Sequence, residues 1–164
     1  MTSVALLPLA DRTKAINSAI ATPEEAAKAL GYIHLRFNEI LGGYNAGWFK
    51  TEGYGHSVEA AEQAKEGIFD VRLTNDTELY LRLADVIDNE KAAQDLRDVA
   101  ALVEIGMKKR DVQAYLYAHR VIHDVDSFVL NSPDDGEEPY GAARSVKGAD
   151  SKKVAEIAAY IEKN

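Results

Sequence analysis

The stretch EKAAQDLRDVAALVEIGMKKRDVQAYLYAHRVIHDVDSFVL, residues 90–130, decides the fold class because it predicts two consecutive amphipathic helices. In its first half, apolar residues recur at steps of three and four, the spacing that places side chains on one face of an α-helix: Ala92, Leu96, Val99, Val103 and Met107. The cations at residues 108–110 suit the end of this helix, where positive charge meets the negative end of the helix dipole. Asp111 then suits the N-cap of a second helix that continues to about residue 130.

Helical periodicity also dominates the rest of the chain. Thr22, Pro23 and Glu25 have the spacing of an N-cap, a first-turn proline and a capping box, and the helix that they begin should end at Gly42 and Gly43. More helices are expected before Thr22, from Ser57, from the capping-box pair Asn75 and Glu78, and from Asp150.

Together these patterns predict an all-α protein, and no segment has the alternating pattern of a strand. Short connections between helices favour antiparallel neighbours, so we expect a single-domain antiparallel helical bundle of five to seven helices. Residues 1–10 are expected to form a ragged N-terminus, and residues 42–56 and 131–148 to form long loops.

The composition excludes several classes of function. The 164 residues include 27 acidic and 19 basic side chains, and the net charge of −8 argues against nucleic-acid binding, which needs a basic surface. There is no cysteine, so disulfides, thiol catalysis and cysteine-ligated metal sites are ruled out. No window approaches the roughly 18 continuous apolar residues of a membrane span. Because residues 1–10 lack the basic flank of a signal peptide, a cytoplasmic protein is favoured over an exported one.

One polar constellation stands out on the helix predicted at residues 111–130. At about 100° per residue, His119, His123 and Asp126 fall on one stripe, which is otherwise flanked by aliphatic side chains. Two histidines four residues apart can bind one metal ion from a single helix, and a carboxylate three residues further on can add a ligand or orient one. His34 and Asn38 have the same spacing and could complete the site from a facing helix. A separate, narrow face of the same helix is polar: Gln113, Arg120, Asp124 and Ser127.

Three interpretations of this stripe are open. The sequence favours a buried hydrogen-bond network between packed helices, in which Asp126 accepts from His123. The second interpretation is a metal site of His119, His123 and Asp126, joined by His34, for a divalent ion such as zinc. The third is acid–base catalysis. The motif of a zinc peptidase is missing, since no glutamate follows His119 to act as its base.

Residues 42–56 form a loop that holds five of the 11 glycines and the one tryptophan. Tyr44, Trp48, Phe49 and Tyr54 on this glycine-rich frame suit stacking on a flat ligand or insertion into a partner's pocket. Trp48 and Phe49 could instead close one end of the bundle. The leading prediction is a non-enzymatic interaction or accessory protein that binds a protein partner or small ligand through this loop, and self-association is also open. The alternative is a metal-binding bundle.

Overall fold

The structure is a computed structural model that describes residues 9–38, 41 and 71–164. These residues form seven α-helices and one π-helical turn, in the order α1 (Leu9–Ala19), α2 (Pro23–Phe37), α4 (Val71–Thr74), α5 (Thr77–Val86), α6 (Glu90–Lys109), α7 (Val112–Val125), η3 (Asp126–Leu130) and α8 (Ser151–Lys163). No strand occurs among them, which confirms the all-α helical bundle.

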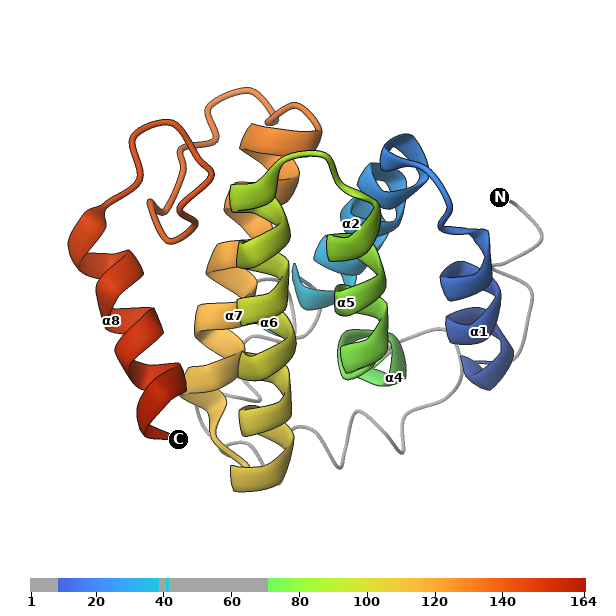
Figure 1. Cartoon of the computed structure of the whole chain (residues 1–164), viewed down its shortest axis with the longest axis horizontal. Helices are drawn as coiled ribbons and strands as arrows, with labels where there is room; N and C mark the ends of the chain where they lie inside the picture. Colours follow the sequence, from blue (N-terminus) through green and yellow to red (C-terminus); the bar gives the residue numbers. More distant parts are fainter. Residues whose placement is uncertain (1–8, 39–40, 42–70) are drawn as a thin grey trace.

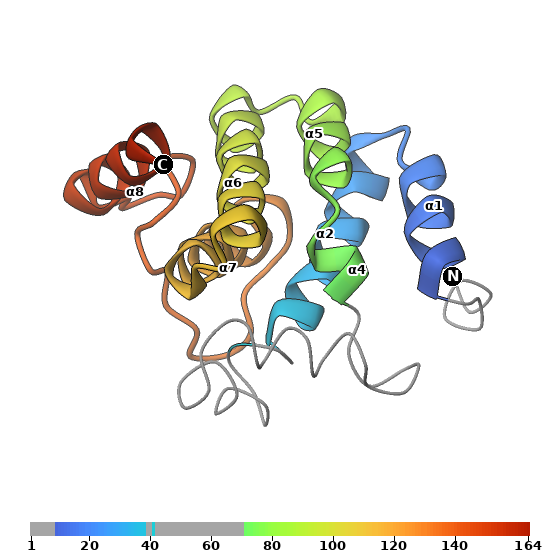
Figure 2. The ribbon, with the colours of Figure 1, turned by 90° about the horizontal axis from the view of Figure 1, so that it is seen from below.

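The helices α5, α6 and α7 run antiparallel at the centre of the molecule, with α6 packed against both of the others (Figure 1). Helix α2 contacts two of these helices, α5 and α7, and it also contacts α4 and η3. The view from below shows α1 and α8 at opposite ends of this arrangement (Figure 2). Helices α2 and α7 are in contact with each other, and they carry the histidines of the candidate metal site.

The helix starts follow from local side chains. The Thr22 capping box is present as predicted, and Asn89, Asp111 and Asp150 cap α6, α7 and α8. The predicted Asn75 cap is wrong by one residue, because Asp76 caps α5 instead. The Asn75 side chain accepts a hydrogen bond from the Tyr115 hydroxyl at 2.6 Å, and this tertiary contact replaces the local one.

The predicted apolar faces form the core. Most of the largest fully buried side chains come from α2, α5, α6 and α7, among them Phe37, Leu30, Leu83, Leu96 and Ile122. Within the part of the chain that the structure describes, no helix is both long and apolar enough to cross a membrane.

Two differences from the sequence analysis bear on the site. The helix predicted to continue to residue 130 changes to a π-helical turn at Asp126, where the Asn131 amide donates to the Asp126 carbonyl at 2.8 Å. The polar face predicted for α7 is not solvated throughout, because Asp124 is fully buried and Ser127 is also buried. Residues 131–148 contain no helix or strand, as expected.

Several predictions fall partly or wholly outside the described residues. The loop at residues 42–56 and nearly all of the helix predicted from Ser57 lie outside them, as do residues 1–8. Residues 9 and 10, which were expected in the ragged N-terminus, are instead the first residues of α1.

A candidate metal centre between α2 and α7

Three histidines from two helices meet in the interior of the bundle. His34 lies on α2, and His119 and His123 lie one turn apart on α7. The ring centre of His34 is 5.6 Å from that of His119 and 5.2 Å from that of His123. The three residues are 5%, 9% and 9% exposed, so the predicted burial of the stripe is confirmed.

Asp126 fixes the orientation of His34. Its Oδ2 atom lies 2.7 Å from His34 Nδ1, and its Oδ1 atom accepts a 2.6 Å hydrogen bond from the Asn131 side chain. The same Asn131 nitrogen donates to the Ala27 carbonyl on α2 at 2.9 Å, which ties the carboxylate to both helices. The predicted pairing of Asp126 with His123 is wrong, because the start of the π-helical turn directs the Asp126 carboxylate across to α2.

His119 and His123 each have an oxygen partner of their own. His119 Nε2 lies 2.7 Å from Asn38 Oδ1, and its ring is stacked on Phe37 with an interplanar angle of 11°. His123 Nε2 lies 3.3 Å from the Glu138 carbonyl, and the Tyr140 ring packs edge-on against His123 with centres 4.8 Å apart.

These partners determine which nitrogen of each ring carries the proton. A carboxylate, an amide oxygen and a backbone carbonyl can only accept, so each histidine donates from the nitrogen that faces its partner. A neutral imidazole that donates from one nitrogen has a lone pair on the other. In the neutral form of each ring, the lone pair is on Nε2 of His34 and on Nδ1 of His119 and His123. His34 Nε2 is buried and has no hydrogen-bond partner within the described part of the chain.

The surroundings keep His119 uncharged near neutral pH. Burial lowers the pKa of its imidazole from 6.5 to about 3, and the nearby His34, His123 and Arg120 act in the same direction. A metal ligand must be a neutral imidazole, so this environment favours the form that binds an ion.

The separations of the His34 ring from the other two rings can be compared with those of metal ligands. Two imidazoles bound to one tetrahedral zinc have ring centres about 5 Å apart, because each nitrogen is about 2 Å from the ion. The two separations from His34 match this value. In residues 9–38, 41 and 71–164, no three His, Asp or Glu side chains already form a group that could hold an ion. Binding an ion would therefore require the rings to reorient.

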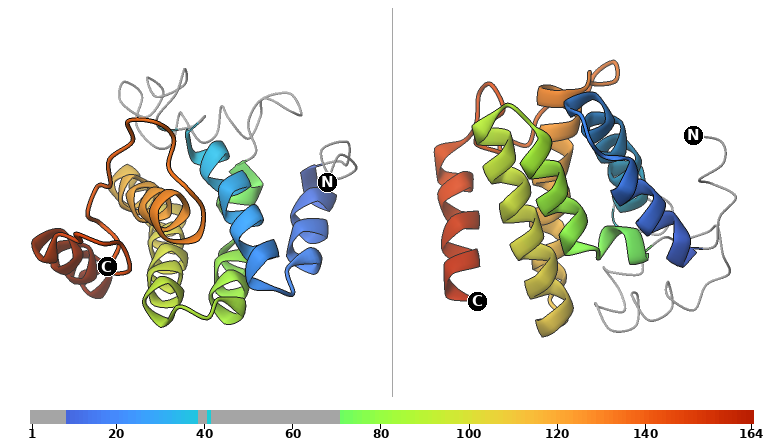
Figure 3. Two further views of the ribbon diagram at one scale, coloured as in Figure 1. Left: turned by 90° about the horizontal axis from the view of Figure 1, so that it is seen from above. Right: turned by 45° about the vertical axis from the view of Figure 1, so that its right-hand side comes forward.

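A segment outside the helices covers His123, and the sequence analysis did not identify what holds it. Figure 3 shows residues 131–150 passing the C-terminal end of α7 on the way to α8. Asp124 accepts hydrogen bonds from the backbone amides of Tyr140, Ala142 and Ala143 at 2.6–3.1 Å. This explains why Asp124 is buried rather than solvated.

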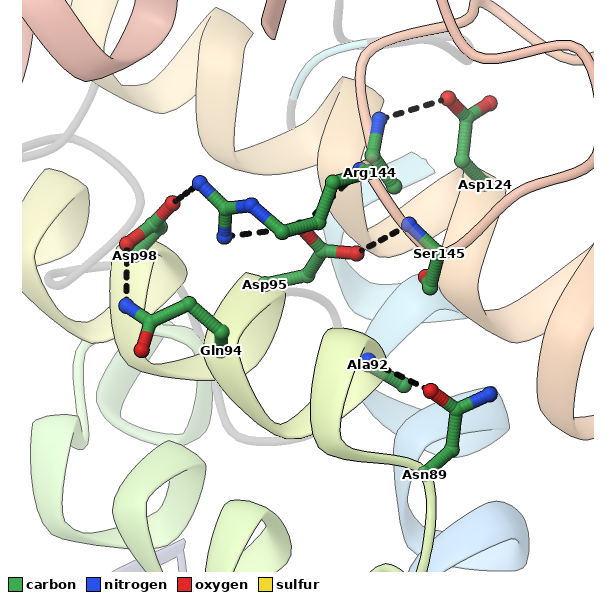
Figure 4. Close-up of polar contacts among 9 residues, drawn as sticks. Asn89, Ala92, Gln94, Asp95, Asp98, Asp124, Arg144 and Ser145 are labelled. Atoms are coloured by element: carbon green, nitrogen blue, oxygen red, sulfur yellow. Dashed lines mark hydrogen bonds and ion pairs between the residues drawn. The ribbon is translucent and has the colours of Figure 1, made fainter.

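A second buried carboxylate holds the same segment on α6 (Figure 4). Asp95 accepts from the backbone amides of Arg144 and Ser145 and from the Arg144 guanidinium, whose other nitrogen pairs with Asp98 at 2.7 Å. Burial raises the pKa of Asp95, and the hydrogen bonds from Ser145 and Arg144 oppose that rise.

The structure thus brings together His34, His119, His123 and Asp126, the residues that the sequence analysis selected for a metal site. Of the additional residues, Asn38 was noted as a neighbour, while Asn131, Glu138 and Tyr140 were missed because their contacts come from a loop without periodicity. Tyr44, Trp48, Phe49 and Tyr54 lie outside the described residues, so partner binding through them stays a prediction. The chain matches no protein-family model, and comparison with curated proteins and with solved structures gives no match.

Proposed function

We propose that the protein binds one divalent transition-metal ion through His34, His119 and His123. The observation that carries this proposal is that one nitrogen of each ring faces an oxygen acceptor, which leaves the other nitrogen for an ion, and that the His34 ring lies 5.6 Å and 5.2 Å from the other two rings. Histidines that bind metals usually donate their second nitrogen in this way, because the acceptor fixes the tautomer and the orientation of the ring.

Asp126 acts in this proposal through His34 and not as a ligand. Both of its oxygens are engaged, one by His34 and the other by Asn131. A carboxylate behind a histidine raises the basicity of the ring and strengthens its bond to the ion. The proposal therefore removes Asp126 from the ligand set expected from the sequence and keeps His34, His119 and His123.

The chemistry of the site selects the class of ion. Neutral imidazoles suit zinc, nickel, copper and cobalt, whereas magnesium and calcium prefer oxygen ligands. Among the described residues the buried Nε2 of His34 has no hydrogen-bond partner, which also favours a bound ligand over a purely structural network, because a buried polar atom without a partner costs about 1–3 kcal/mol.

Thermal unfolding of tag-free, metal-stripped protein tests the proposal. At a zinc concentration of about 100 Kd, binding adds about 2.7 kcal/mol, which raises the Tm by roughly 5–10 °C for a chain of this size. Nickel and cobalt should also raise the Tm, while magnesium and calcium should not.

The variants His34→Gln, His119→Gln and His123→Gln should each remove most of the shift. Lys91→Gln, an exposed substitution at the start of α6, should keep it. If no ion raises the Tm of the wild-type protein, the histidines form only a structural hydrogen-bond network.

A further inference from the structure

Tyr140 stands between the histidine cluster and solvent. Its ring centre lies 4.8 Å from that of His123 and 6.4 Å from that of His119, yet 42% of the residue is exposed. One part of this side chain therefore contacts the two α7 histidines while another is in contact with water. Arg120 lies over the same ring at 5.9 Å.

The backbone of Tyr140 is held from two helices. Its amide donates to Asp124 on α7 at 2.7 Å, and its carbonyl accepts from the Lys153 ammonium on α8 at 2.7 Å. Two residues earlier, the Glu138 carbonyl is the acceptor for His123 Nε2. The Tyr140 backbone is thus held by Asp124 and Lys153, neither of which belongs to the histidine cluster.

The segment before Tyr140 is held less firmly. Beyond Asn131, residues 132–136 are all exposed, and the bonds between Asp134 and Glu137 are local to the turn. Downstream, residues 142–145 are secured on Asp124 and Asp95. We therefore expect that a movement of Tyr140 away from the histidines would displace the residues between 131 and 140 and not those after Tyr140.

We infer that Tyr140 is the outer wall of the metal site and controls how fast the ion enters and leaves. This inference rests on the proposed function, because it assigns a role to a residue that touches two of the proposed ligands. The Tyr140 ring blocks the path of the ion between the site and solvent, and it does not itself bind the ion. Removing it should accelerate both loading and release, so that the rates change more than the equilibrium affinity.

Metal exchange measured by stopped flow tests this role. Zinc-loaded, tag-free protein is mixed with excess chromogenic chelator to follow release, and metal-free protein is mixed with zinc to follow loading. Tyr140→Ala should increase both rates at least tenfold while Kd changes less than threefold. Tyr140→Phe keeps the ring and should exchange zinc at the wild-type rates, and circular dichroism verifies that both variants are folded.

The outcomes separate the two proposals. If wild-type protein binds no zinc, the proposed function itself fails. If wild-type protein binds zinc and Tyr140→Ala exchanges it at unchanged rates, the metal site stands and the role of Tyr140 is overturned. A slower or unchanged loading rate combined with a weaker Kd would also overturn it, since that result describes a stabilising contact and not a barrier.

Discussion

His34 Nδ1 lies 2.7 Å from Asp126 Oδ2, although the two residues are 92 positions apart in the chain. This contact joins the last turn of α2 to the π-helical turn that follows α7. A π-helical turn is uncommon and is often found at functional sites. Here the turn carries the carboxylate that orients one of the three clustered histidines.

Asp126→Asn should weaken zinc binding by about 10–100-fold, the usual effect of losing an acceptor behind a metal-ligating histidine. The amide can still accept from His34, but it lacks the negative charge that increases the basicity of the ring. Isothermal titration of metal-stripped protein measures the change. An unchanged Kd in a folded Asp126→Asn variant would show that the carboxylate does not act on the metal site.

Gly106→Ala should destabilise the protein by about 1–2 kcal/mol, although alanine is favoured over glycine within helices by about 1 kcal/mol. A Cβ at this position of α6 would lie 2.4 Å from the Tyr115 ring, which is buried and held by Asn75. Gly31→Ala is the matched control, because its Cβ would come no closer than 3.4 Å to any neighbouring side chain, so this variant should not lose stability. Urea unfolding of both variants gives the comparison, and equal stabilities would contradict the packing at Gly106.

Asp124→Asn should lower the free energy of unfolding by about 3 kcal/mol, because an amide nitrogen would face backbone N–H donors and leave at least one of them unpaired. Asp135→Asn, an exposed substitution in the same loop, should have no measurable effect. Chemical denaturation distinguishes the two. Similar stabilities of the variants would mean that Asp124 does not secure residues 140–143.

Alkaline pH should loosen α8. Burial and Asp111 raise the pKa of Tyr160 above its ordinary value of 10, and the hydrogen bond to Glu156 does the same for Tyr117. The unfolded chain therefore loses these protons at lower pH than the folded one, so the free energy of unfolding should fall as pH rises above 10.

Urea unfolding at pH 9 and pH 11 measures this fall. Tyr160→Phe should show a smaller decrease than wild type. If Tyr160→Phe loses as much stability as wild type over this range, the phenol does not contribute to the pH dependence.

The sequence predicted the parts of the fold that depend on neighbouring residues. The caps at Thr22 and Asp111 are hydrogen bonds between residues two or three positions apart, and they can be recognised from spacing alone. The same holds for His119 and His123, because one helical turn separates them and their common stripe follows from the helical period.

The remaining features depend on contacts between distant segments. Asp124 was placed on a polar face because nothing near it in the sequence indicates the backbone amides 16–19 residues later that bury it. Asp126 was paired with His123 on one helix, whereas the π-helical turn and Asn131 direct it to α2. A helical pattern gives the face on which a carboxylate lies but not which of two histidines it contacts.

X-ray absorption spectroscopy of tag-free protein loaded with one equivalent of zinc tests the metal site most directly. The account predicts three imidazole nitrogens at about 2.0–2.1 Å from the ion, reduced in number in His34→Gln. A first shell made only of oxygen atoms, or a spectrum that is unchanged by His34→Gln, would contradict it.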